Sequence, residues 1–329
     1  MLQCLDFPIE KEYDNSFVGW DKLKKQLKEI GIDGLDCVWL PTQRDESIPK
    51  DLLIGGRIVT MPDWVDYVQD NRKELRRRIG TAKQVKEVYG EPEQFILHYI
   101  FSLHDAIRCG AKFISMEVYN VTYEESQSYE WRHDDQTVMT AAATIINLIL
   151  QDVEPTFDFL IENSWWPGFR FTEPEKTEYL LSRIEYPRKG IMLNTSHLMN
   201  TNPDIRSEEE GAEYICSMLE KHGELAKTVL GLRLSQSVSG EFVRRLKKAH
   251  EATKEIAGFP KYQEAEGILY YNINAIDQRL PWTSPEAGKI VKAVDPKYLV
   301  HSPRIDPKSP KLSVVKEQMD VIQKGLAQL

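Results

Sequence analysis

Several short apolar runs of this chain end on, or near, a side chain that can carry charge or move a proton. The runs "GGRIV", "ISMEV", "FLIEN", "IMLNTSHL", "LGLRLS" and "YLVHSP" contribute Arg57, Glu117, Glu162, Asn194, His197, Arg233 and His301. Burying an unpaired charge is costly, so charged groups in such runs must pair with one another or serve a site. Carboxylate and imidazole side chains gathered at one place could perform general acid–base chemistry.

A second group of polar residues lies in "YNINAIDQRLPW", where Asp277 and Arg279 stand between an apolar stretch and a Pro-Trp pair. An Asp-x-Arg sequence is compatible with a surface ion pair. It is also what an Asp-x-His metal-ligand pair becomes when its histidine is replaced. Trp165, just after "FLIEN", could stack on a sugar or another ring, although covering the end of a sheet is the commoner role for such a residue.

The elements that must position these residues alternate between strands and helices. Strand-like segments cover residues 1–7, 34–40, 51–60, 111–118, 156–163, 189–198, 228–235 and 297–303. Amphipathic helical segments follow most of them, and the segment from Ser207 begins with a Ser cap and acidic residues. This alternation predicts a parallel sheet, and its number of units favours a closed (β/α)8 barrel over a doubly wound sheet. No G-x-G-x-x-G follows any of these strands, so the dinucleotide fingerprint of the doubly wound fold is missing.

The predicted organisation is a single α/β domain, one (β/α)8 barrel over residues 1–329. A long loop or insertion is expected near residues 256–285, before the last strand. Because catalytic groups of such barrels lie at the carboxyl ends of the strands, the strand-end residues named above should converge there.

Composition excludes several classes of function. The 329 residues include 41% hydrophobic and 28% charged residues, with a net charge of −9, which is typical of a globular protein and unfavourable for broad binding to a nucleic-acid backbone. The four cysteines form no CxxC pair, so a zinc ribbon is not indicated and a reduced, cytoplasmic chain is expected. No apolar run reaches the roughly 18 residues of a membrane span, so no membrane partner is expected.

The chain resembles the xylose-isomerase-like and endonuclease IV-like TIM barrels, often called sugar phosphate isomerases/epimerases. The resemblance lies in four motifs taken in order: "FLIEN", "MLNTSHL", "GLRLSQSVSGE" and "IDQRLPW". The resemblance covers nearly the whole chain. It implies that Glu162 matches a strand-end metal ligand, and that Asn194-x-x-His197 matches an Asp-x-x-His pair. It further implies that Arg57, Arg233 and Arg279 stand where the family carries histidines. The final strand usually ends in Glu, and here it reads His301-Ser302.

These departures from the family pattern invert the charge of its metal site. Guanidinium groups have no lone pair for a metal and would repel a cation, whereas they suit carboxylates and phosphates. We therefore expect no metal cofactor and a small anionic substrate. The alternative is a divalent metal such as zinc or manganese, held by Glu162, His197 and His301. Catalytic roles fall to Glu162, His197 and Asp277, and substrate-binding roles to Arg57, Glu117, Asn194, Arg233, Arg279, His301 and Trp165.

Four functions remain open. The first is an isomerase, epimerase or lyase that acts on a small carboxylated or phosphorylated, sugar-like substrate. The second is a conventional metal-dependent sugar isomerase, and the third is a non-catalytic anion-binding pseudoenzyme or partner protein. An abasic-site nuclease is the weakest, because the ligands it requires are those that differ. No nucleic-acid partner is expected, and the sequence leaves a homodimer open.

The inverted charge predicts that the purified protein lacks a stoichiometric divalent metal. Replacing lone-pair donors by guanidinium removes ligands and adds a repulsion of a few kcal/mol, even at an effective dielectric constant of about 20. Elemental analysis after dialysis checks this. Retention of about one zinc, manganese or iron per chain would instead favour the metal-dependent alternative.

Overall fold

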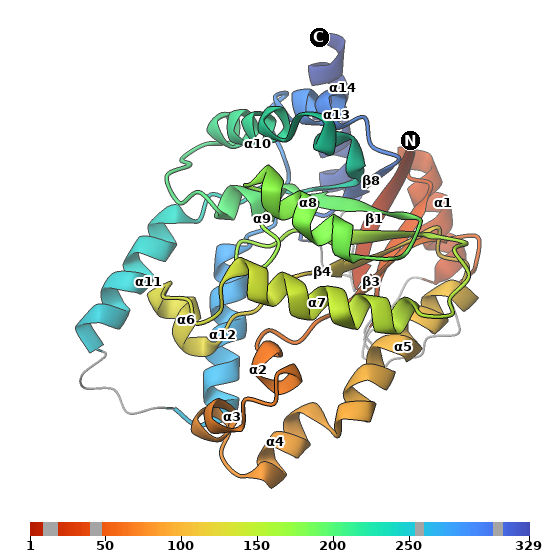
Figure 1. The fold of residues 1–329 in the computed structure, drawn as a ribbon. Helices are drawn as coiled ribbons and strands as arrows, with labels where there is room; N and C mark the ends of the chain where they lie inside the picture. The colour runs from red at the N-terminus through yellow and green to blue at the C-terminus, as the bar shows by residue number, and fades with distance from the viewer. Residues whose placement is uncertain (9–18, 40–47, 254–259, 305–311) are drawn as a thin grey trace.

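The strands of the chain close into one parallel barrel. The computed structural model describes residues 1–8, 19–39, 48–253, 260–304 and 312–329. Eight strands pair in chain order, and the last pairs with the first (Figure 1). They are β1 (Leu2–Pro8), β2 (Gly34–Trp39), β3 (Leu53–Ile58), β4 (Phe113–Glu117), β5 (Asp158–Glu162), β6 (Lys189–Asn194), β7 (Val229–Leu234) and β8 (Tyr298–His301). The predicted (β/α)8 barrel is thereby confirmed.

Helices cover the outside of this barrel and extend beyond its carboxyl end (Figure 1). They are α1 (Trp20–Ile30), α2 (Val65–Val68), α3 (Arg72–Arg78), α4 (Ala82–Tyr89), α5 (Pro92–Arg108), α6 (Tyr123–Ser128), α7 (Asp135–Leu150), α8 (Pro174–Arg183), α9 (Thr195–Asn200), α10 (Glu208–His222), α11 (Gly240–Thr253), α12 (Tyr262–Ile276), α13 (Ala287–Val294) and α14 (Leu312–Ala327). Local signals start several of them: the Ser207 side chain caps α10 as predicted, and Thr122 and Thr81 form capping boxes at α6 and α4. Within the described residues, no helix is long and apolar enough to cross a membrane.

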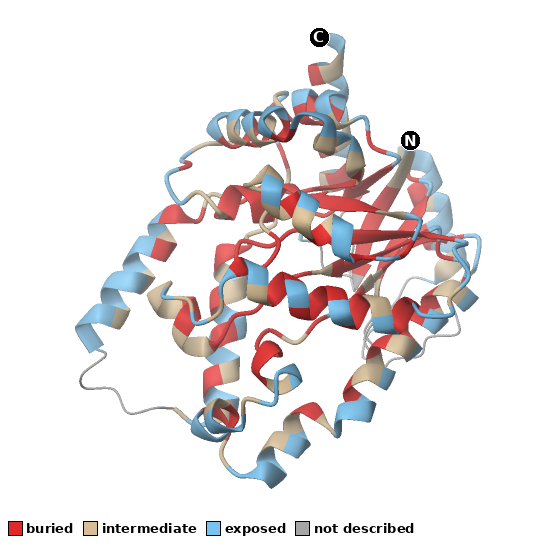
Figure 2. Cartoon of the chain, in the orientation of Figure 1, coloured by how far each residue is buried: buried red, intermediate tan, exposed pale blue. Residues whose placement is uncertain are grey.

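Apolar side chains form two main layers, one between strands and helices and one inside the barrel. Figure 2 shows the strands almost wholly buried, whereas the outward faces of the covering helices are exposed. Inside the barrel, the amino-terminal half is filled by Cys4, Ile54, Phe113, Leu160, Met192, Tyr298 and Val300. Near the carboxyl end this filling changes: the inward side chains there are polar or charged, and the functional site begins at that level.

The segment near residues 256–285, predicted as a long loop or insertion before the last strand, contains a helix where the structure describes it. Helix α12 occupies Tyr262–Ile276, and residues 256–259 lie outside the described residues. The helix buries Ala265, Leu269, Asn272 and Ile276, which share one face at helical spacing. The Gly-Phe-Pro start of this segment indicated a loop, but the periodicity after it decided the structure.

Two glycines predict opposite responses to the same substitution. A Cβ on Gly325 of α14 would clash with the carbonyl group of Pro285, whereas a Cβ on Gly267 of α12 would meet nothing within 4 Å. Gly325→Ala should therefore lower the free energy of unfolding by about 1–3 kcal/mol. Gly267→Ala should raise it by up to about 1 kcal/mol, because alanine favours helix more than glycine. Urea denaturation of the two variants checks this, and shifts of the same sign would contradict the packing described for α13 and α14.

Candidate functional site

An arginine lies inside the barrel among three carboxylates. The guanidinium of Arg233, on β7, has Nη1 2.8 Å from Asp36 and 3.5 Å from Asp6, and Nε 3.0 Å from Glu162. Its Nη2 donates hydrogen bonds to Glu162 (3.2 Å) and to Ser115 (3.3 Å). The Asp36 contact is close but poorly directed as a hydrogen bond, so charge attraction dominates it. All four ionic side chains are at most 1% exposed.

Strand register assembles this cluster. Asp6 pairs with Asp36, Glu117 with Glu162, and Asn194 with Arg233 across neighbouring strands. Paired residues of a sheet direct their side chains to the same face, which here is the barrel interior. The amide of Asn194 also donates to Glu162 (2.9 Å). Each charged group of the cluster is therefore fixed in place by residues far away in the sequence.

Asp6 connects the buried cluster to two further arginines. Arg279 Nη2 lies 2.5 Å from its carboxylate and Arg57 Nη2 lies 3.6 Å away, while Ser302 donates to it as well. Burial alone would raise the pKa of Asp6, but the guanidinium groups of Arg57, Arg279 and Arg233 lower it well below its usual range. Arg279 reaches this position from a backbone φ of 49°, which is uncommon for a residue other than glycine.

Asp36 is held less firmly in its charged form than Asp6. Burial raises the pKa of Asp36 to about 6, although Arg233 acts in the opposite direction. The neighbouring carboxylate of Asp6 adds to the increase. Asp36 therefore takes up a proton more readily than Asp6 or Glu162, whose pKa values the neighbouring arginines lower.

Above this cluster a cavity of about 200 Å³ opens at the carboxyl end of the strands. Its walls come from the exits of β3 and β4, from the loop after β5, from α9, and from the end of α12. Its lining residues are Arg57, Ile58, Val59, Thr60, Glu117, Tyr119, Trp165, Trp166, His197, Ile273, Asp277 and Arg279. Unlike Arg233, the side chains of Arg57 and Arg279 are 20% and 24% exposed, so both are accessible from the cavity.

His197 lies between two carboxylates of this cavity. Its Nδ1 donates to the carbonyl oxygen of Asn163 (2.8 Å) and lies 3.4 Å from Glu117, while its Nε2 lies 3.5 Å from Asp277. Ser196 in turn donates to Asp277 (2.8 Å). These contacts fix the plane of the ring and leave both nitrogens next to groups that can exchange protons.

The pKa values of Glu117 and His197 lie on opposite sides of neutrality. Burial raises the pKa of Glu117 to about 6, with the positive charge of His197 limiting the increase. Burial would lower the pKa of His197, but Glu117 and Asp277 outweigh it and raise that pKa to about 9. Burial also opposes ionisation of Asp277, yet His197 keeps its pKa below the ordinary value. At neutral pH the cavity thus holds an ionised Glu117 beside a protonated His197.

Six of the predicted site residues line the cavity: Arg57, Glu117, Trp165, His197, Asp277 and Arg279. Glu162, Asn194 and Arg233 lie directly beneath it instead. The prediction that Arg233 contacts a ligand is wrong, because its guanidinium is completely buried and already surrounded by carboxylates. A bound anion is therefore not needed to balance its charge.

The placement of His301 in the site is also wrong. Its ring contacts Gln3 (3.0 Å) and Gln318 of α14 (3.0 Å), so it faces the helix layer. Its register partners are Leu5 and Leu234, which belong to the outer apolar core. Because side chains alternate along a strand, Ser302 faces the interior and His301 does not. Burial lowers the pKa of His301 to about 4, which keeps the ring neutral.

Two functional acids, Asp6 and Asp36, were missed by the prediction from sequence. Each lies in the middle of a short apolar strand, in "LQCLDFP" and "GLDCVW". An acid within such a strand has to be paired, and this signal was present in the sequence. The prediction was restricted to residues near strand ends and therefore did not include these two acids.

The residues present do not fit a divalent metal at the position that the sequence resemblance implies. Among the described residues, no three or more histidine, cysteine or acidic side chains are arranged to hold a metal ion. The inward carboxylates Asp6, Asp36 and Glu162 surround the Arg233 guanidinium, which fills the place where a cation would have to lie. The alternative ligand set of Glu162, His197 and His301 is not assembled, since His301 faces the helices.

The chain matches no protein-family model and no curated protein sequence. It is similar in structure to endonuclease IV from Thermus thermophilus, with 11% identity, a TM-score of 0.50 and 100% of both chains covered. It is also similar to D-psicose 3-epimerase with D-tagatose from Clostridium cellulolyticum H10, with 11% identity, a TM-score of 0.49, and 100% of this chain and 98% of that chain covered. At this identity the likeness shows the fold alone, a single (β/α)8 barrel.

The buried ionic cluster predicts that Arg233→Met lowers the stability of the folded protein. Removing one partner leaves Asp36 and Glu162 charged and unpaired in the interior, which should cost about 3–5 kcal/mol in the free energy of unfolding. The loss should be smaller at pH 5 than at pH 8, because unpaired buried carboxylates have raised pKa values and take up protons as the pH falls. Urea denaturation at both pH values measures this.

Arg245→Met is the matched control, because Arg245 forms an exposed pair with Glu241 and its loss should change stability by less than about 1 kcal/mol. The double variant Arg233→Met/Asp36→Asn should recover part of the loss. A loss for Arg233→Met no larger than that of the control would contradict a buried ionic cluster.

Proposed function

We propose that this chain is an isomerase or epimerase, or a lyase, that moves a proton on a small carboxylated or phosphorylated sugar-like substrate without a divalent metal. The observation that carries the proposal is His197 held between Glu117 and Asp277 in a cavity with two accessible arginines. Groups whose surroundings move their pKa values to opposite sides of neutrality are a sound basis for assigning an acid and a base.

In this proposal Glu117 is the general base. Its carboxylate takes a proton from the carbon next to a substrate carbonyl, while His197 donates a proton to the carbonyl oxygen, and an enediol results. Returning the proton to the neighbouring carbon gives isomerisation, returning it to the other face of the same carbon gives epimerisation, and loss of a β-substituent gives elimination. Glu162, our sequence-based candidate for the base, serves instead to neutralise Arg233, because it is completely buried and ion-paired.

Arg57 and Arg279 supply the positive charge in this scheme. Both contact Asp6, so a single buried carboxylate faces two guanidinium groups on the cavity side. Both side chains also line the cavity, so their guanidinium groups can donate hydrogen bonds to a carboxylate or phosphate and would stabilise negative charge that develops on the carbonyl oxygen. Asp277 holds the His197 ring and favours its protonated form.

The assignment predicts a bell-shaped pH dependence of kcat/KM. Glu117 must be ionised, so activity rises through its pKa of about 6, and His197 must be protonated, so activity falls through its pKa of about 9. Glu117→Gln and His197→Gln should each lower kcat/KM by about 10²–10⁴-fold. Residual activity of the first variant should lack the acidic limb, and that of the second should lack the basic limb.

The measurement is exchange of carbon-bound hydrogen with deuterium from the solvent, followed by mass spectrometry over a panel of sugar phosphates and sugar acids. His104→Gln, on the exposed surface of α5, is the control and should leave exchange unchanged. If some panel members bind but none exchanges, the non-catalytic binding protein becomes the better description.

Anion binding should depend on Arg57 and Arg279. Each charge-assisted hydrogen bond contributes about 1.5–3 kcal/mol, so Arg57→Met or Arg279→Met should weaken a bound carboxylate or phosphate ester at least about tenfold. Calorimetric titration measures this, with thermal unfolding to confirm that each variant is folded. Arg188→Met is the matched control, because Arg188 pairs with Asp158 at the opposite end of the barrel. Equal affinity in all the proteins would contradict the assignment.

A further inference from the structure

Arg304 contacts the segment that carries two residues of the cavity, although it does not line the cavity itself. It follows β8, and the residue is exposed. Its main-chain N–H donates to the carbonyl oxygen of Arg279 (2.7 Å). Its guanidinium Nη2 donates to the carbonyl oxygen of Asp277 (3.0 Å) and to Oδ1 of Asn274 (3.1 Å), and it lies 3.3 Å from the Asn274 carbonyl oxygen. All these acceptors belong to residues 274–279, which comprise the last residues of α12 and those just after it; we call them the α12 corner.

The end of a helix offers such oxygen atoms to a cation. The last carbonyl groups of a helix have no partner within it, and they carry the negative end of the helix dipole. Arg304 contacts two carbonyl groups of the α12 corner from the side of β8. From the loop after β7, Ser237 Oγ donates to a third, the carbonyl group of Ile276 (2.5 Å). The α12 corner is therefore attached to the exits of two strands.

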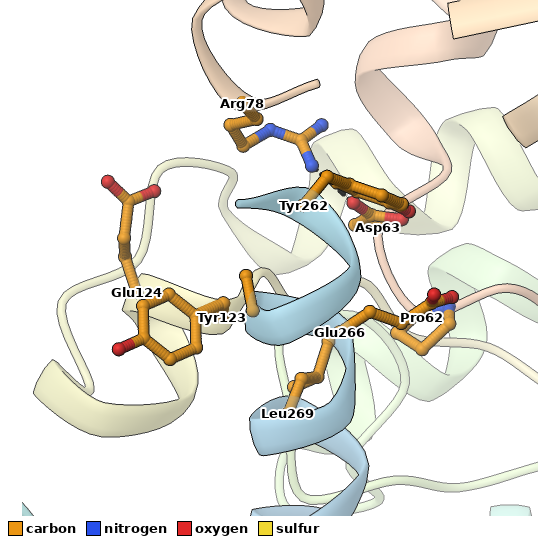
Figure 3. Close-up of a pocket in the computed structure, with 9 residues that line it drawn as sticks. Pro62, Asp63, Arg78, Tyr123, Glu124, Tyr262, Glu266 and Leu269 are labelled. Atoms are coloured by element: carbon orange, nitrogen blue, oxygen red, sulfur yellow. Dashed lines mark hydrogen bonds and ion pairs between the residues drawn. The ribbon is translucent and has the colours of Figure 1, made fainter. Parts of the chain in front are cut away.

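The opposite end of α12 has fewer polar attachments. There Tyr262, Glu266 and Leu269 lie beside Pro62 and Asp63, and a gap of about 20 Å³ remains among them (Figure 3). Within the part of the chain that the structure describes, neither the Tyr262 hydroxyl nor the Glu266 carboxylate forms a hydrogen bond or ion pair. The placement of the α12 corner thus depends on the polar contacts made at that corner.

The residues held in this way are those that face the chemistry. Asp277 lies 3.5 Å from His197 Nε2, and the side chain of Arg279 extends from the same corner to Asp6. The backbone φ of Arg279 is 49°, an uncommon conformation that its surroundings must maintain. Two residues of the β8 exit do so: Ser302 accepts hydrogen bonds from the Arg279 guanidinium at its carbonyl oxygen (3.2 Å) and its Oγ (2.8 Å), and Arg304 donates to the Arg279 backbone.

Building on the proposed function, we propose that Arg304 is a positioning residue of the active site. It holds the backbone of the α12 corner so that Asp277 faces His197 and Arg279 reaches a bound anion. Arg304 does not contact the substrate. Its loss leaves the corner attached on the β7 side alone, so both side chains become less well placed.

Amide hydrogen exchange tests the hold on the corner directly. In Arg304→Met the backbone amides of residues 274–280 should exchange at least about tenfold faster than in the wild type, because local opening becomes easier. Arg244→Met is the matched control, since Arg244 is also exposed, donates to the carbonyl oxygen of Pro203 (2.8 Å), and does not line the cavity. Arg304→Lys keeps the charge without the planar fork of donors and should give an intermediate rate. It carries the test should the methionine variant fail to fold.

A double-mutant cycle tests whether Arg304 acts through Arg279. Calorimetric titration with inorganic phosphate and with gluconate should show binding weakened about threefold to tenfold in Arg304→Met. In an Arg279→Met background the same change should weaken binding by less than about twofold, because the positioned group is already absent. In an Arg57→Met background the full effect should remain, since Arg57 belongs to β3 and has no contact with the α12 corner among the described residues.

The outcomes separate this role from the proposed activity. Unchanged amide exchange in Arg304→Met, or an undiminished loss of affinity in the Arg279→Met background, would overturn the positioning role. If amide exchange rises but the wild type binds neither phosphate nor gluconate, Arg304 holds the corner and the proposed anion site fails. If the cycle shows the expected coupling but no carbon-bound hydrogen of any panel member exchanges with solvent, the positioning role stands and the proposed isomerase or lyase activity fails.

Discussion

The ionic contact between Arg233 and the carboxylates inside the barrel is the constraint on which the rest of the site depends. Barrel interiors are ordinarily filled by branched apolar side chains, and the amino-terminal half of this one follows that pattern. Replacing the upper layer with charges is acceptable only if each charge is paired, because desolvation of an isolated ion costs several kcal/mol. Asp6, Asp36 and Glu162 provide that pairing from three different strands.

This pairing also determines the chemistry of the cavity above. Since Arg233 occupies the position where inward carboxylates would otherwise bind a cation, those carboxylates are no longer available as metal ligands. Asp6 then directs its remaining lone pairs toward Arg57 and Arg279, which places positive charge at the cavity floor. Proton transfer is left to Glu117 and His197, the two groups whose pKa values the surroundings move toward opposite sides of neutrality.

Helix α12 gives this site its second wall. It packs on α6 and α11, and its residue Ile273 and the following Asp277 line the catalytic cavity. The polar network of Asp63, Asp66 and Glu74 with Arg78 and Arg132 joins the segment after β3, which contains α2 and α3, to the loop before α7. The catalytic cavity thus depends on the strands, which carry Arg57 and Glu117, and on α9 and α12, which position His197 and Asp277.

Local patterns in the sequence were sufficient to predict the barrel and most of the side chains from which the site is made. Strand and helix periodicities are local properties, so all eight strands and the strand-end residues Arg57, Glu117 and His197 could be identified from them. Which of those side chains meet follows instead from the three-dimensional fold. The face toward which His301 points depends on strand parity, and a shift of one residue moves a side chain to the other face. The partners of Arg233 and the contact of Arg279 with Asp6, 273 residues apart, depend on closure of the barrel, which no local pattern records.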